Sequence, residues 1–166
     1  MPQGKMKTVM VGGAAMYPSK NIVENAVNSK DHTTLVAAVK AAGLVETLKG
    51  DGPFTVFAPT NAAFDKLPAG TVETLLKPEN KAMLTSVLTY HVIAGKIDAA
   101  TLQDWIVKSG GTYTVKTVQG GELKFMLDAD NNIWLMDGQG NKAKVTIKDV
   151  FQKNGVIHVI DTVVLP

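Results

Sequence analysis

The three histidines of this chain are the residues best suited to acid–base or metal chemistry, because imidazole titrates near neutral pH and binds metal ions. They are His32, His91 and His158, separated by 59 and 67 residues. The sequence contains no short-spaced pair such as His-x-x-x-His, which brings two ring nitrogens of one helix to the same ion. The histidine spacing therefore predicts no metal site.

Two of the histidines are embedded in apolar sequence, which favours a place in the core over a catalytic role. His91 lies at helical spacing from Leu84 and Leu88, and His158 lies within an apolar run near the end of the chain. Because buried polar groups are normally hydrogen-bonded, we expect both rings to be paired with backbone or hydroxyl groups. His32 is expected in the exposed first turn of a helix.

Other catalytic and ligand-binding motifs do not occur in the sequence. None of the four serines lies in a Gly-x-Ser-x-Gly elbow, and there is no Walker sequence. Residues 128–132 resemble the start of a calcium loop, but Ile133 and Gln139 occupy the positions that require glycine and glutamate. A polar hairpin turn is the better interpretation. A hydrolase that uses His91 or His158 is the least favoured hypothesis, and we expect no enzyme activity and no cofactor.

The charge pattern argues against nucleic-acid and membrane partners. All 17 basic residues are lysine, 15 residues are acidic, and the net charge is +2. Arginine, the residue best suited to forked recognition of phosphate or guanine, does not occur. The apolar stretch 9–16 is shorter than the ~20 residues that span a bilayer. The chain contains no cysteine, so disulfides and thiolate chemistry are excluded.

Lysines also alternate along one predicted strand. Lys142, Lys144 and Lys148 are separated by apolar residues and share one strand face. A solvated face that discourages edge-to-edge pairing is the favoured interpretation. The alternative is a weak contact surface for an anionic polysaccharide or a cell envelope.

Hydrophobic periodicity predicts an α+β fold. Before residue 110 the period is mostly helical, with Asp31 expected as the N-cap of one helix and Thr60 or Asn61 as the cap of another. Phe54–Ala58 interrupts the helices as a short buried strand. After residue 110 the period is two, which predicts a mainly antiparallel sheet that ends in an apolar central strand.

Three segments in this order resemble the two signature boxes and the Tyr-His motif of the fasciclin domain. They are GPFTVFAPTNAAF at 52–64, LTYHVI at 88–93 and NGVIHVID at 154–161, the last running on to residue 166. The resemblance extends to DHTTL at 31–35 and LVETLKG at 44–50, and covers roughly residues 20–166. We therefore expect a flexible N-terminal segment at 1–19, either a tag or a signal remnant, followed by one fasciclin-like domain at 20–166.

The resemblance implies a compact β-wedge or sandwich with helices packed on one side. It also implies a non-enzymatic adhesion module that is secreted, periplasmic or on the cell surface and binds a surface or matrix protein or glycan. In animal relatives an Asp-Ile pair before the second box and the Tyr-His region are implicated in partner binding. The matching residues here are Asp149, Val150, Tyr90 and His91, with valine in place of isoleucine and the Tyr90 hydroxyl expected near the surface.

A second hypothesis is a periplasmic protein that binds a small ligand in an apolar cleft between helices and sheet. It rests on the surplus of apolar residues and on 7 methionines, a residue type that adapts to irregular pockets. The oligomeric state stays open.

Overall fold

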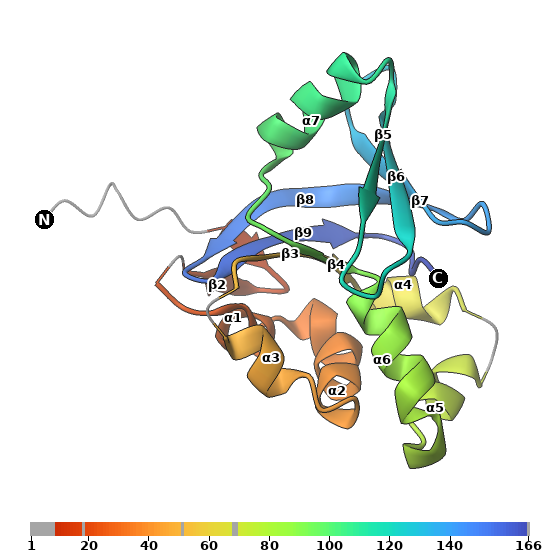
Figure 1. Cartoon of the computed structure of the whole chain (residues 1–166). Helices are drawn as coiled ribbons and strands as arrows, with labels where there is room; N and C mark the ends of the chain where they lie inside the picture. Colours follow the sequence, from red (N-terminus) through yellow and green to blue (C-terminus); the bar gives the residue numbers. More distant parts are fainter. Residues whose placement is uncertain (1–8, 18, 51, 68–69, 166) are drawn as a thin grey trace, which may run out of the picture.

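The computed structural model describes residues 9–17, 19–50, 52–67 and 70–165. Its α-helices precede most of its strands, which confirms the predicted α+β order (Figure 1). The helices are α1 (Ile22–Ala26), α2 (Thr33–Ala41), α3 (Val45–Lys49), α4 (Asn61–Asp65), α5 (Thr71–Leu75), α6 (Lys81–Thr89) and α7 (Ala99–Lys108). Short 3-10 turns at Lys30–His32 and Pro78–Asn80 lead into α2 and α6.

The strands form a small hairpin and one large sheet. The hairpin pairs β1 (Val9–Val11) with β2 (Ala14–Met16). The large sheet has the order β4-β3-β9-β8-β7-β6-β5. Its strands are β3 (Phe54–Pro59), β4 (Val92–Ala94), β5 (Thr112–Lys116), β6 (Glu122–Leu127), β7 (Ile133–Met136), β8 (Lys142–Gln152) and β9 (Gly155–Ile160).

Strand β8 joins two parts of this sheet that stand at an angle to one another (Figure 1). Its first residues pair with β7, and the rest pair with β9 through two register shifts, between Val145 and Ile147 and between Ile147 and Val150. Such bulges bend a strand and increase its twist. Beyond the edge strand β5, the Val118 N–H donates to the Val92 carbonyl at 2.8 Å, so the chain after β5 returns to β4. The sheet is thereby curled toward closure.

Parallel strands β3 and β9 form the middle of the molecule and face two separate cores. Val56 and Ile157 point into the core under α1–α6, which we call the helical-side core. Phe57 and Ile160 point the other way, into the core under α7 and β5–β8, which we call the α7-side core. Helices on one side of a sheet were expected; α7 packs on the opposite side (Figure 1).

The β1–β2 hairpin belongs to the packed region, although the expected domain boundary at residue 20 leaves it out. Val11 and Met16 are buried in the helical-side core. Gly12, at the hairpin tip with φ 57°, lies against the turn before α2, where a Cβ would come within 2.3 Å of Ser29 Oγ. Residues 1–8 lie outside the described residues, so a flexible segment there stays a prediction.

The start of α2 differs from the prediction. Its N-cap is His32, whose side chain does not cap the helix, so the expectation that Asp31 caps it is wrong. The Thr34 N–H donates instead to Asn61 Oδ1 at 3.0 Å, from 27 residues further along the chain. Thr60 caps α4 by accepting the Ala63 N–H at 3.1 Å, as predicted.

Candidate functional site

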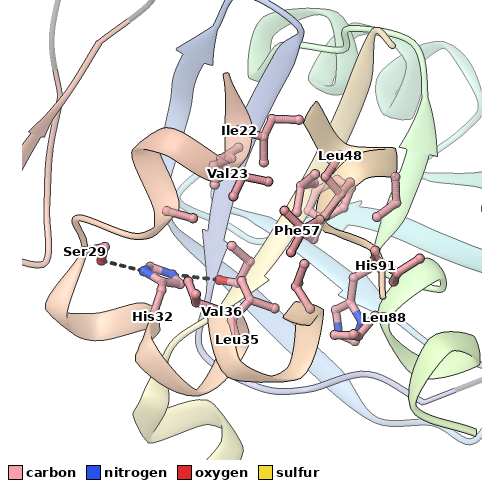
Figure 2. A pocket seen from close by; sticks show the side chains of 18 of the residues that line it. Ile22, Val23, Ser29, His32, Leu35, Val36, Leu48, Phe57, Leu88 and His91 are labelled. Carbon is pink, nitrogen blue, oxygen red and sulfur yellow. Dashed lines mark hydrogen bonds between the residues drawn. The ribbon is translucent and has the colours of Figure 1, made fainter. Parts of the chain in front are cut away.

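An apolar pocket lies between the helices α1–α3 and the strands β3 and β9 (Figure 2). Its volume is about 50 Å³, several times the ~10–15 Å³ that one water molecule requires. Aliphatic side chains form almost all of its wall, among them Ile22, Leu35, Val36, Leu48 and Ile157. A wall of this kind offers water few hydrogen bonds, and apolar cavities of this type stay dry and accept apolar molecules.

Few polar side chains reach this pocket. Ser29 and His32 lie together in its wall, as Figure 2 shows, and His91 lies apart from them on another element. Lys40 lies in the last turn of α2 and is exposed. Among the described residues that line the pocket, it is the only one with a charged side chain. The pocket therefore combines an apolar body with two neutral imidazoles and one cation.

His32 is buried, so the prediction of an exposed ring is wrong. The Ser29 hydroxyl donates to Nδ1 at 2.7 Å, and Nε2–H donates to the Ala58 carbonyl at 3.3 Å. Burial lowers the pKa of His32 below its ordinary value, since desolvation penalises the imidazolium. Bonds to Ser29 and to Ala58 of β3 hold the ring, and the polar local sequence around Lys30 and Asp31 carries no signal of this burial.

His91 is buried and hydrogen-bonded on both sides, as predicted. Nδ1–H donates to the Val87 carbonyl at 2.8 Å, and Nε2 accepts the Val164 N–H at 3.2 Å. Its ring thus ties the end of α6 to the segment after β9. Desolvation lowers the pKa of His91 to about 4, so the ring is neutral at physiological pH.

Tyr90 differs from the prediction that its hydroxyl lies near the surface. The side chain is 1% exposed and packs in the α7-side core. Its hydroxyl donates to the Glu122 carbonyl at 2.5 Å, which joins the end of α6 to the start of β6. Burial raises the pKa of the Tyr90 phenol.

Asp149 and Val150 occupy the bulged part of β8. Val150 is 1% exposed, packs in the helical-side core and lines the pocket. Asp149 has φ 58°, and its Oδ1 accepts the N–H of Ala99, the first residue of α7, at 2.7 Å. Partner binding by these residues stays a prediction, as it does for Tyr90 and His91; Tyr90, His91 and Val150 would require the core to open.

His158 is paired as predicted and links Asp149 to α7. Its Nδ1 accepts the Asp149 N–H at 3.1 Å, and Nε2–H donates to the Ile97 carbonyl at 2.9 Å. Desolvation lowers the pKa of this ring, which keeps it neutral and able to accept from Asp149. Asp98 caps α7 through the Thr101 N–H at 2.8 Å, and its bonding to the side chain and backbone of Thr101 lowers the pKa of its carboxyl. Asp149, His158, the Ile97 carbonyl and Asp98 together fix the start of α7 to the sheet, and we call these four groups the clamp.

The predicted polar hairpin turn at 128–132 is confirmed. The Asp128 carboxylate accepts four N–H groups, from Asp130, Trp134 and both the backbone and the side chain of Asn132. These bonds, with that from Trp134 foremost, lower the pKa of Asp128 well below its usual range. Across the parts of the chain that the structure describes, no group of three His, Asp or Glu side chains is placed to hold a metal ion.

Asn154 is a structural residue that the sequence indicated only as a turn. It is buried, and its Nδ2 donates to the carbonyls of Leu48 at 2.6 Å and Gly50 at 2.8 Å. Its Oδ1 accepts the Ile22 N–H at 3.0 Å. One amide in the second signature box thus holds α1 and α3, two of the helices around the pocket, against the sheet.

Comparison with known proteins gives consistent results. The fasciclin domain family matches residues 30–166. Protein sll1483 of Synechocystis is 51% identical over 96% of this chain and 81% of its own length. The cell surface glycolipoprotein MPB83 of Mycobacterium bovis is 38% identical over 94% of this chain and 64% of its own length.

A solved structure shares the fold. A FAS1 domain pair from the insect cell adhesion molecule fasciclin I superposes with a TM-score of 0.76 at 18% identity, over 93% of this chain and 56% of that chain. None of the helices within the described ranges is both long and apolar enough to cross a membrane. The family match, the relatives and the fold agree: the chain belongs to the fasciclin domain family.

Proposed function

We propose that this fasciclin domain is a non-enzymatic adhesion or interaction module that works outside the cytoplasm, at a cell surface, in the periplasm or in the extracellular space. The observation that carries the proposal is the family membership, since a relative is described as a cell surface glycolipoprotein and a structural neighbour as a cell adhesion molecule. Its partner is a surface or matrix protein or glycan.

The histidine geometry supports a non-enzymatic role. A general base needs a free nitrogen within reach of a substrate proton. Both nitrogens of His91 and of His158 are engaged with backbone groups, and both rings are buried. The hydrolase hypothesis depended on these two rings, and in this fold neither offers a base to a substrate.

A surface-plasmon assay tests the adhesive role. The folded chain is immobilised and exposed to cell-envelope fractions and to a panel of matrix proteins and glycans. We expect saturable binding to at least one fraction. If folded protein binds nothing in the panel, the adhesive role is wrong.

A second candidate function, the binding of an apolar small molecule, is favoured by the pocket between α1–α3 and the sheet. Its wall is aliphatic, it lies beneath helices of five and nine residues, and it is already open to about 50 Å³ in the structure. The buried Gln152 lies outside the pocket lining, and neither polar atom of its amide group has a hydrogen-bond partner in the structure. Gln152 lies two residues beyond the pocket residue Val150 on β8, so it shares that residue's strand face.

Native mass spectrometry of the freshly purified chain tests this candidate. We expect a retained apolar molecule that is lost in Val36→Phe, which fills the pocket, and kept in Val107→Phe, a matched change at an exposed position of α7. Retention of the molecule by Val36→Phe would place it elsewhere, and a wild-type chain without any bound molecule would remove this candidate.

A further inference from the structure

We infer that the outer face of β5–β8 binds an acidic polysaccharide through a row of lysines around Trp134; this inference rests on the proposed function and specifies its partner. We call this surface the lysine face. Its members are the outward-facing residues of the four strands: Thr112, Thr114, Lys116, Glu122, Lys124, Met126, Trp134, Met136, Lys142, Lys144 and Thr146. Lys148 was predicted on the same face as Lys142 and Lys144, but it lies beyond the first register shift of β8, after which Ile147 packs in the helical-side core, so the prediction is wrong for this residue.

Strand register sets the lysines around an apolar centre. Met136 pairs with Lys124 on one side and Lys142 on the other, and Trp134 pairs with Met126 and Lys144. Neighbouring strands are ~4.8 Å apart, so the Cα atoms of Lys124 and Lys142 are separated by ~10 Å. Trp134, Met126 and Met136 are partly exposed between these cations. The result is a strip with an apolar middle and positive flanks.

The opposite side of the same strands is filled, so the lysine face is the side left to solvent. Leu123, Phe125 and Leu135 point inward and are 0% exposed. They pack in the α7-side core with Leu102 and Ile106 of α7. Lys116, Lys124 and Lys142 are exposed on the other side.

Direct ion pairs do not neutralise these lysines. Throughout the described parts of the chain, Lys108–Asp104 is the single salt bridge, and it lies on α7. Glu122 is the carboxylate within the face, opposite Lys116. At the margins Asp128 is occupied by four N–H donors, and Asp161 accepts the Lys144 N–H at 2.9 Å through its carboxylate. Four lysines therefore act together on a chain whose total charge is only +2.

This combination suits an acidic polysaccharide. An extended chain of uronate rings offers carboxylates at regular intervals to the lysines, while its ring faces lie on the Trp134 indole and the methionines. Indole is amphipathic and rigid, and lysine stems add apolar contact below each ammonium. Nucleic acid is a poorer fit because it calls for arginine forks and exposed aromatic stacking platforms.

Affinity electrophoresis of the whole chain in gels that contain polygalacturonate tests the inference. The triple variant Lys124→Gln/Lys142→Gln/Lys144→Gln is compared with Lys49→Gln/Lys77→Gln/Lys81→Gln, a control on exposed lysines of the helical side. Both triples change the net charge from +2 to −1 (2 − 3), so the effect of charge on mobility is matched. Gels with fully methyl-esterified pectin control for uncharged sugar.

We expect the wild-type chain to be retarded by polygalacturonate but not by the esterified polymer. The dissociation constant should rise about tenfold in the lysine-face triple and less than about twofold in the control, since three exposed ion pairs are lost in one case only. Absence of retardation, or equal loss in both triples, overturns the inference and leaves the face as a solvated surface. Equal binding to single-stranded DNA or to phosphatidylglycerol vesicles overturns it in favour of a general anion surface.

Tryptophan emission locates the polymer. In Trp105→Phe the remaining indole is Trp134, so polygalacturonate should shield its emission from acrylamide quenching. Unchanged quenching at saturating polymer places the contact elsewhere. The envelope-binding assay separates the two proposals: if the lysine-face triple still binds envelope fractions, the adhesive role stands and this surface is the wrong one.

Discussion

The two cores of this domain share the strands β3 and β9 but are packed differently. The α7-side core is filled by aromatic rings: Phe57 lies 5.2 Å from Phe125 and 5.5 Å from His158 between ring centroids, with Tyr90 buried beside them. The helical-side core is mostly aliphatic and retains a cavity of about 50 Å³. Two faces of one sheet thus differ in how completely their side chains fill the space.

The difference follows from the elements that cover each face. Four of the helices on the helical side, α1, α3, α4 and α5, have five residues each. Helices this short are not stable alone and depend on tertiary contacts such as those of Asn154. The α7 side is closed by a ten-residue helix and four paired strands. We therefore expect a small molecule to displace the helices of the helical side at a lower cost in free energy than the elements of the α7 side.

Truncation of one residue in each core should give the largest difference in the free energy of unfolding. Phe125→Ala removes a fully enclosed ring and is expected to lower the free energy of unfolding by about 3–5 kcal/mol. Leu35→Ala removes a side chain that lines the cavity and has fewer contacts to lose, so a loss near 2 kcal/mol is expected. Urea denaturation of both variants measures the difference, and equal losses would contradict the contrast in packing.

Acid should weaken the helical-side core through His91. The pKa of this ring is about 4 in the fold against 6.5 in the unfolded chain, so between these values the unfolded state binds more protons. His91 therefore leaves the free energy of unfolding unchanged above pH 6.5 and lowers it as the pH drops from 6.5 to 4. The total loss from this ring is about 3 kcal/mol.

Urea midpoints between pH 7.5 and 4 measure this slope. His91→Gln should be less stable at pH 7.5 but should lose less stability on acidification than the wild-type chain. His32 and His158, whose pKa values are also lowered, keep a residual slope in that variant. An unchanged slope in His91→Gln would contradict the assignment of a neutral, buried ring.

Gln152 provides a test of whether the helical side holds a ligand. Its amide is buried without a hydrogen-bond partner, so Gln152→Met is expected to raise the free energy of unfolding by about 1–2 kcal/mol. The melting temperatures of Gln152→Met and of the wild-type chain are compared, each as purified and after denaturation and refolding. If the substitution lowers the melting temperature only in the samples as purified, a retained molecule bonds to this amide.

Asp149 tests the clamp on the α7 side. Asp149→Ala removes the acceptor of the Ala99 N–H and places alanine at φ 58°, so a loss of about 1–2 kcal/mol is expected. Asp149→Asn keeps an acceptor oxygen and tolerates the left-handed region, and should change stability by less than about 0.5 kcal/mol. Amide hydrogen exchange should speed up across α7 in the alanine variant. Faster exchange in α1–α3 instead would contradict the conclusion that Asp149 stabilises the α7 side.

The smallest effects should come from one added methylene on each side of the sheet. Val56→Ile extends a side chain that lines the cavity and should stabilise by up to about 0.8 kcal/mol. Val164→Ile overfills the α7-side core, where Val164 is 0% exposed, and should destabilise by about 1 kcal/mol. Opposite signs in melting temperature confirm the contrast, and the same sign for both would refute it.

The positions of individual polar residues show how far sequence reasoning reached. His91 and His158 were placed in the core correctly because apolar neighbours at helical or strand spacing surround them in the sequence. The prediction for His32 is wrong, since its local neighbours Lys30 and Asp31 are polar and its ring is paired with the Ala58 carbonyl, 26 residues along the chain. Tyr90 was placed wrongly because a helix end allows its side chain to turn toward β6, 32 residues away.

The sequence by itself determined the family, the α+β order and the buried strands, because these depend on periodicity and on contiguous motifs. Only the tertiary structure decided that a cavity remains under the short helices, that Asp149 anchors α7, and that four lysines from β5, β6 and β8 share one face with Trp134. The physical reason is register: contacts between strands and helices far apart in the chain depend on pairing and bulges, which local residue patterns do not specify.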